Sequence, residues 1–214
     1  MGLTGELASA NVTFVKDGPL PFYVGEDDPP AKQEILRAGL KLFSARGLAA
    51  TSIREIAAES GFTNPALYKH YVGKEELALH LFETCHRRVW ARCHAALSGG
   101  KSFDEKLERY VGEWLEIMDA HPDVLAFLSD SARVLWPKAS PAVRRQTMIG
   151  LARSLMLGAP HRRRKSAVAS VDLAAASVQG TLAETFRMIQ VGVLDGPAVR
   201  WKSGLVALFR RLTV

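Results

Sequence analysis

The sequence has 214 residues, of which 48% are hydrophobic and 23% charged, and its formal net charge at pH 7 is +6. This balance is typical of a globular protein with a buried core, and it excludes collagen-like, disordered and rod-like coiled-coil chains. No stretch approaches the roughly 18 uninterrupted apolar residues of a membrane helix, so we expect no membrane partner. The only cysteines are Cys85 and Cys93, and no basic-then-apolar leader is present, which predicts a cytoplasmic protein without a disulfide framework.

The first thirty residues differ in composition from the rest. They contain one basic residue, Lys16, against five acidic ones, and Gly and Pro interrupt their short apolar pieces. We expect residues 1–30 to form an irregular extension. The alternative is an arm that enters a DNA minor groove, but such arms carry Arg or Lys, so the acidic charge disfavours it.

From Ala31 onward the apolar residues recur three and four apart, without a period-two run of β-branched residues, which predicts an all-α protein. A first helix is expected from Ala31 to Arg46. A short second helix begins at Thr51 or Ser52, where a capping box is possible, and ends at Gly61. Further helices are expected over residues 63–71, 74–97, 102–121, 123–136, 140–158 and 168–193, and a last one ends near Leu212. We expect the basic run Arg162–Lys165 to form a solvated loop between helices.

The stretch from Thr51 to Lys74 has the spacing of a helix-turn-helix. Ala57 lies four residues before Gly61. The small side chain of Ala57 permits the two helices to pack closely, and Gly61 can adopt the backbone conformation that the turn between them requires. Apolar residues in this stretch form a buried side. The remaining short polar or flat groups lie at the start and flank of the second helix, where helix-turn-helix proteins enter a major groove. The candidate DNA-binding residues are Thr51, Ser52, Thr63, Asn64, Pro65, Ala66, Tyr68, Lys69, His70 and Lys74.

The chemistry of these residues fits a nucleic-acid partner. Asn64 can pair with adenine, Thr63 can bond a base or a phosphate, and Ala66 can touch a thymine methyl group. We expect the remaining hydroxyl, cationic and aromatic groups to contact phosphates, Lys74 among them at a positive helix terminus. For any one residue an ordinary role is equally open, because Thr and Asn also cap helices and Tyr also packs on a core.

These residues also carry a family resemblance. The strings Thr51-Ser52-Ile53-Arg54-Glu55-Ile56-Ala57, Leu67-Tyr68-Lys69-His70-Tyr71 and Lys74-Glu75-Glu76-Leu77 resemble the TetR (tetracycline-repressor-like) family of transcriptional regulators over about residues 31–81. Phe62, Gly39 and Gly73 depart from the residues usual in that family. The resemblance implies a DNA-binding domain at 31–76, a helical effector-binding and dimerisation domain at 77–214, and a repressor released from a palindromic operator by a small hydrophobic or aromatic effector.

The resemblance further implies a homodimer built from the last two helices and an effector pocket among the middle ones. The candidate dimer residues form apolar stripes: Ala174, Val178, Leu182, Thr185, Phe186, Val206, Phe209 and Leu212. The candidate pocket residues supply large apolar surface: Trp90, Tyr110, Trp114, Met118, Phe127, Trp136 and Phe186. In both sets the alternative is that the side chains belong to the domain's own core.

Two other function classes compete with a DNA-binding regulator. An enzyme is disfavoured, because the sequence contains no P-loop, nucleophile elbow or zinc-protease motif, and we expect no cofactor. The Cys85-His86 and Cys93-His94 pairs are eight residues apart on one helix, about 12 Å, too far to share a metal ion. A helical dimeric interaction protein that has lost DNA binding remains the alternative.

Overall fold

The computed structural model describes residues 21–159 and 170–212, and the basic run Arg162–Lys165 lies outside them. The regular elements in the described ranges are helices: α1 (Pro30–Arg46), α2 (Ile53–Ser60), α3 (Asn64–Tyr68), α4 (Lys74–Ser98), α5 (Phe103–Ala120), α6 (Pro122–Leu135), α7 (Pro141–Arg145), α8 (Met148–Leu157), α9 (Val171–Gln190) and α10 (Lys202–Arg211), with two short 3-10 turns, η1 (Trp136–Lys138) and η2 (Ala198–Trp201). The all-α class expected from the sequence is confirmed over these residues.

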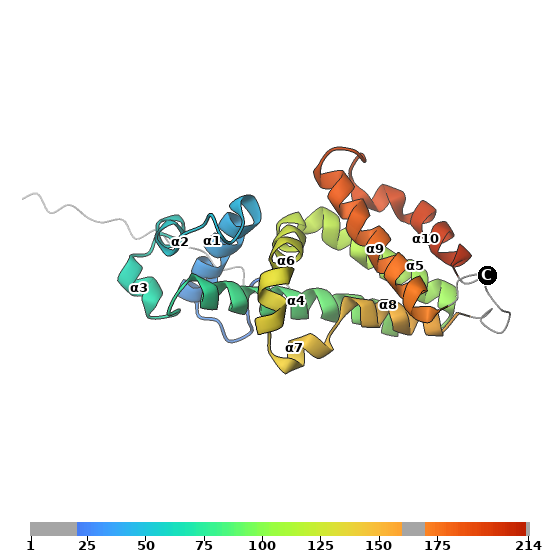
Figure 1. Cartoon of the computed structure of the whole chain (residues 1–214), viewed down its shortest axis with the longest axis horizontal. Coiled ribbons are helices and arrows are strands. Elements are labelled where there is room, and N and C mark those ends of the chain that lie inside the picture. Colours follow the sequence, from blue (N-terminus) through green and yellow to red (C-terminus); the bar gives the residue numbers. More distant parts are fainter. Residues whose placement is uncertain (1–20, 160–169, 213–214) are drawn as a thin grey trace, which may run out of the picture.

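The long helix α4 joins a small head to a larger helical body. Figure 1 shows α1, α2 and α3 grouped at one end, α4 running from this head along the body, and α9 and α10 at the far side. Helix α5 packs along α4, while α6 packs on both α1 and α4. The Phe43 ring of α1 stacks on Phe127 of α6 with 5.7 Å between centroids, so the head and the body share one continuous core.

Most helix starts follow from capping residues. The side chains of Ser52, Thr63, Ser102 and Ser140 each accept a hydrogen bond from the amide three residues later, as expected of N-caps. None of the helices in residues 21–159 and 170–212 combines the length and the apolar composition that crossing a lipid bilayer requires.

Two expected helices differ in extent. The helix expected from Ser140 to Gly158 is two helices, because Gln146 leaves the helical region and Thr147 begins α8 by accepting from Gly150 N at 3.1 Å. The helix expected over residues 63–71 is α3, and it ends at Tyr68 rather than near Tyr71. Tyr71 instead turns inward and is 3% exposed, so its ring packs in the core.

The expected irregular extension is irregular over its described residues, 21–29, but part of it is packed. Phe22 and Val24 are 5% and 1% exposed and therefore belong to the core. Sequence periodicity gave no sign of this, because two buried side chains in a non-helical segment form no helical stripe.

Candidate functional site

The helices α2 and α3 meet at a tight turn around Gly61. Ser52 and Glu55 form a capping box at the start of α2, in which Ser52 N donates to Glu55 Oε2 at 2.8 Å. Gly61 has the left-handed φ of 75°, and the next amide donates back to a carbonyl of α2, which closes that helix. The capping box and the glycine turn expected from the sequence are both confirmed.

The outer surface of α3 carries the residues expected to read DNA. Leu67 is fully buried and fixes α3 on the core, whereas Tyr68 is 51% exposed. Helix α3 lies at the end of the molecule farthest from α10 (Figure 1), so nothing in the described chain covers it. Of the residues named above, those exposed here are Thr63, Pro65, Tyr68, Lys69 and His70, and those half-buried are Asn64 and Ala66.

Thr51 does not fit its expected role. Its side chain is only 2% exposed, and its hydroxyl donates to Gly47 O at 2.9 Å. This hydroxyl ties the end of α1 to the start of α2 and has no surface to offer to a phosphate. Ser52, by contrast, is exposed, although its hydroxyl already donates to Glu55 Oε2 at 2.8 Å.

Lys74 is also used inside the chain. Its Nζ donates to the carbonyls of Leu48 and Thr51 at 2.9 and 2.8 Å, with Ala49 O at 3.4 Å. An ammonium group has three protons to donate, and these carbonyls account for them. Lys74 therefore fastens the loop between α1 and α2 to the start of α4, contrary to the expectation that its charge is held for a phosphate.

A shallow groove of about 420 Å³ borders this surface, between the starts of α2 and α4. No side chain caps the start of α4, so its first-turn amides are open to an anion. Arg54, which the sequence did not single out, is exposed nearby on α2 without an ion-pair partner among the described residues. The groove is lined by Ala49, Ala50, Thr51, Ser52, Ile53, Tyr68, Gly73, Lys74 and Glu75.

A second cavity, of about 270 Å³, lies within the body. No Asp, Glu, Lys or Arg lines it. Burial lowers the pKa of His86 in its wall, which favours the neutral ring, although the bond from His86 Nε2–H to Gln146 O at 2.6 Å opposes this shift. Trp114 Nε1 is buried without a well-aligned acceptor in the described chain. The lining residues are His86, Val89, Trp114, Leu125, Leu128, Ser129, Ala132, Met148, Gln179, Ala183 and Phe186.

Only two of the seven candidate pocket residues, Trp114 and Phe186, line this cavity. Met118 and Phe127 are core residues, and Tyr110 is buried with its hydroxyl donating to Gln179 Oε1 at 3.2 Å. The other two aromatics lie elsewhere: Trp90 stacks on His94, and Trp136 packs edge-on behind His86. Large aromatic residues in the sequence therefore do not distinguish a cavity wall from an ordinary core. The polar residues His86 and Gln179 lie on otherwise apolar helix faces, and they were the sequence signal for this cavity.

The candidate dimer stripe faces inward. Val178, Leu182 and Phe209 are fully buried in the single chain, so they cannot be a contact surface for another copy. Leu212 is half-buried, and the remaining members, Ala174, Thr185, Phe186 and Val206, are 4–9% exposed. The residues that α9 and α10 leave outward are others, and they include Leu173, Ala176, Ser177, Gly180 and Glu184 on α9, and Gly204, Ala207, Leu208 and Arg211 on α10.

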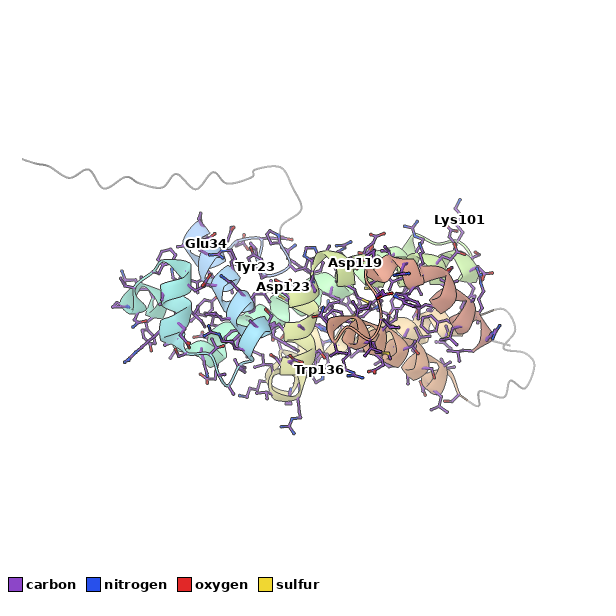
Figure 2. The ribbon with its side chains drawn as sticks, turned by 90° about the horizontal axis from the view of Figure 1, so that it is seen from above. Tyr23, Glu34, Lys101, Asp119, Asp123 and Trp136 are labelled. Carbon is purple, nitrogen blue, oxygen red and sulfur yellow. The ribbon has the colours of Figure 1, made fainter. Side chains whose placement is uncertain are left out.

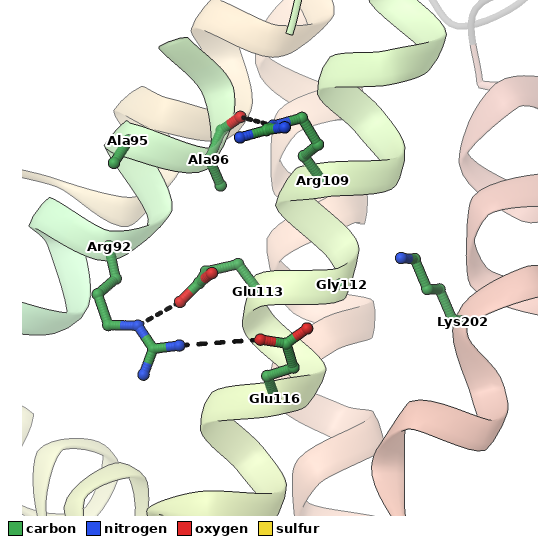
Figure 3. A pocket seen from close by; sticks show the side chains of 8 residues that line it. All are labelled: Arg92, Ala95, Ala96, Arg109, Gly112, Glu113, Glu116 and Lys202. Atoms are coloured by element: carbon green, nitrogen blue, oxygen red, sulfur yellow. Dashed lines mark hydrogen bonds and ion pairs between the residues drawn. The ribbon is translucent and has the colours of Figure 1, made fainter. Parts of the chain in front are cut away.

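A polar groove of about 390 Å³ lies between α4, α5 and α10 (Figure 3). Arg92 of α4 reaches across it to the carboxylates of Glu113 and Glu116 on α5. Arg109 Nε donates to Ala96 O at 3.1 Å, which adds a second tie between the same two helices. No three His, Cys, Asp or Glu side chains of the described residues are close enough to hold a metal ion.

Comparison with known proteins identifies this architecture. The family model described as bacterial regulatory proteins of the tetR family matches residues 35–81. An uncharacterised HTH-type transcriptional regulator of Bacillus subtilis, YerO, is 30% identical over 102 residues, which are 45% of this chain and 34% of that protein. The HTH-type transcriptional repressor KstR2 of Rhodococcus jostii is 27% identical over 104 residues, or 49% of this chain and 51% of that protein.

Solved structures resemble nearly the whole chain. KstR2 of Mycobacterium tuberculosis, titled a ketosteroid transcriptional regulator, has a TM-score of 0.70 at 20% identity, covering 84% of this chain and 92% of that one. FadR of Bacillus subtilis in complex with stearoyl-CoA has a TM-score of 0.64 at 14% identity, covering 83% and 96%. At these identities the likeness is one of fold alone.

The chain is therefore a helix-turn-helix protein whose residues 35–81 match the TetR family of bacterial regulatory proteins. The sequence matches span about half or less of the length of these curated relatives. The relatives compared are transcriptional regulators rather than enzymes.

Proposed function

We propose that this TetR-family protein is a homodimeric transcriptional repressor that binds a palindromic DNA operator and is released by a small apolar effector. The observation that carries the proposal is the exposed, polar face of α3, held outward at the end of the molecule by the Gly61 turn. Residues 31–76 form the DNA-binding domain in this proposal, and residues 77–214 form the effector-binding and dimerisation domain.

The proposed DNA contacts divide into two kinds. Asn64 and Ala66 lie in the first turn of α3, where an amide and a methyl group read base edges. Tyr68, Lys69 and His70 are exposed at its end and contact phosphates, as does Arg54. Thr63 caps α3 by accepting from Ala66 N at 3.4 Å, and its hydroxyl proton remains available for a phosphate or a base.

Substitutions on α3 separate these two kinds of contact. The operator is first selected from a pool of random duplex DNA with the full-length protein. Asn64→Ala then reduces the preference for adenine at one position of each half-site about tenfold, because a bidentate contact is lost. Tyr68→Ala weakens binding to all sequences about equally, by up to about tenfold. Fluorescence anisotropy on matched and mutated operators measures both. Equal affinity of the two variants and the wild type for every duplex contradicts the assignment of α3.

The 270 Å³ cavity is the proposed effector site. Its lining holds no charged side chain at neutral pH, so it suits an apolar group, and Trp114 Nε1 and the Gln179 amide can orient a carbonyl or hydroxyl oxygen. Two fold relatives are a ketosteroid transcriptional regulator and a regulator in complex with stearoyl-CoA. A ketosteroid, or an acyl-CoA whose apolar acyl chain enters the cavity, is therefore the first effector to try here.

Filling the cavity tests its role. Ala132 is half-buried in the cavity wall, so Ala132→Trp places an indole where the effector would lie. We expect this variant to keep its operator affinity but to need at least about tenfold more of the active probe for release, with a long-chain acyl-CoA and a ketosteroid as probes. Ala142→Trp, at an exposed position of α7, is the matched control. Unchanged release in Ala132→Trp places the effector elsewhere.

Release follows from the position of α6 in this proposal. Helix α6 lines the cavity through Leu125 and Leu128, and through Phe127 it packs on Phe43 of the head. An effector that favours a different position of α6 thereby favours a different position of α1. In a dimer, such a population shift changes the spacing of the two α3 helices, and with it the match to the half-sites.

The proposed dimer surface is the outward face of α9 and α10, with Leu173 and Leu208 as its large apolar side chains. These are 59% and 45% exposed in the single chain. The same two helices also expose Ala176, Gly180, Gly204 and Ala207, whose small size permits close helix approach. Two copies related by a two-fold axis present two α3 helices to one duplex, as a palindromic operator requires.

A further inference from the structure

The segment Pro21–Pro29, here named the strap, is bound along the junction between the head and the body. It has no helix, yet Phe22 and Val24 are buried almost completely. Figure 2 shows Tyr23 between Glu34 of α1 and Asp123 of α6, which are both among the charges that act on its phenol. A segment that is held at one end by one domain and at the other end by a second domain restricts how those domains can move against each other.

One end of the strap is fastened to the body. Arg88 Nε of α4 donates to Val24 O at 2.9 Å. The Phe22 ring lies 4.4 Å from the ring of His121, the residue that precedes α6, and its centroid is 5.5 Å from the Arg92 guanidinium. Arg92 in turn pairs with Glu113 and Glu116 of α5 (Figure 3), so the Phe22 site joins α4, α5 and the start of α6.

The other end of the strap is fastened to the head. Asp28 Oδ1 pairs with Lys32 Nζ of α1 at 2.7 Å, and Gln33 Nε2 of α1 donates to Asp28 O at 2.8 Å. Asp28 Oδ2 accepts from Gly25 N at 2.6 Å, which holds the bend between the two ends of the strap. Pro29 then leads directly into α1.

We propose that the strap is a clamp that holds the head in one orientation against the body, with Phe22 and Arg88 as its positioning residues. Without it, α1 packs on the body mainly through α6 and α4. The strap adds a third connection. It attaches to α4 and to His121, the residue before α6, and both of these helices line the 270 Å³ cavity. The clamp therefore sets the head orientation that the free protein presents to a partner.

The experiment measures the head-to-body distance in the full-length protein, without DNA or effector, so its outcome is independent of the proposed function. Spin labels are attached at Ala58→Cys on α2 and Ala142→Cys on α7, both exposed positions. The native Cys85 and Cys93 are buried and burial raises the pKa of both thiols, so they stay unlabelled. Labelled chains are diluted with unlabelled ones, so that pulsed electron paramagnetic resonance reports distances within one chain.

We expect one narrow distance distribution with the native strap, and one at least twice as wide in the double variant Phe22→Ala/Arg88→Ala. Arg88→Met, which keeps the aliphatic stem and loses the bond to Val24, gives a smaller widening and decides the question should the double variant fail to fold. Arg87→Ala is the matched control, because Arg87 pairs with Glu83 of its own helix and not with the strap. Distributions as narrow as the wild type in Arg88→Met and in the folded double variant overturn the proposal, even if the melting temperature falls.

Discussion

Replacing Lys74 by methionine lowers the free energy of unfolding by about 2 kcal/mol, or about 4–8 °C in melting temperature. The reason is local: the ammonium group is the common donor for carbonyls of Leu48, Ala49 and Thr51, and methionine leaves these acceptors without it. The site is partly open to water, so the loss is smaller than the sum of three buried charged hydrogen bonds. Thermal unfolding followed by circular dichroism measures this change.

Lys69→Met is the control for that loss, because Lys69 is exposed and bonded to nothing in the described chain. We expect no change in its melting temperature. In DNA binding the two variants differ in the opposite way. Lys69→Met loses one phosphate contact in each head, two in the dimer, and so reduces the slope of log affinity against log salt by about 1.8. Lys74→Met weakens binding with an unchanged slope, because it disturbs the shape of the head rather than a phosphate contact.

The opposite result is equally informative. If Lys74→Met keeps its melting temperature and reduces the salt slope, Lys74 releases its carbonyls and binds phosphate in the complex. Lys74→Arg separates the two roles further, because a planar guanidinium retains the charge but does not fit three convergent carbonyls as a point donor. It therefore keeps the salt slope and loses stability in the structure described here.

The comparison of Lys74 with Ser52 shows which features sequence alone can predict. The capping box of Ser52 and Glu55 is fixed by a spacing of three residues, so it was visible in the sequence. The partners of Lys74 lie 23 to 26 residues earlier in the chain, and only the packing of α4 on the head brings them within reach. A lysine at a helix start predicts a bound phosphate when only the sequence is known. In the folded chain, Lys74 instead donates to backbone carbonyls.

The stripes on α9 and α10 show a second limit of sequence patterns. A period of 3.6 residues predicts that Val178 and Leu182 share a buried face, and they do. Periodicity does not say whether the covering surface belongs to the same chain or to a partner. Here α8 packs closely against α9 and covers the apolar face, which leaves the face with Ala176 and Gly180 outward. The strap was invisible for a related reason, since burial of Phe22 and Val24 depends on contacts with residues more than sixty positions away.

The outward face of α10 leads to the prediction with the largest expected effect. Leu208→Glu places a carboxylate in the proposed dimer surface, where two copies meet across the two-fold axis. The free energy needed to bury an unpaired carboxylate is larger than the association free energy that a small helix contact provides. We therefore expect the variant to be monomeric at micromolar concentration. Sedimentation velocity measures the mass directly. Leu173→Glu, on the outward face of α9, has the same expected outcome.

Loss of the dimer removes nearly all operator binding. In the dimer, the second head binds as an intramolecular event at an effective concentration near the millimolar range, so one head alone loses at least about 100-fold in affinity. Val134→Glu on α6 is the matched control, because Val134 has the same 45% exposure as Leu208 and is expected to stay dimeric and to bind the operator normally. A dimeric Leu208→Glu with full operator affinity moves the interface away from α10, because no two-fold contact built on that leucine tolerates two facing carboxylates.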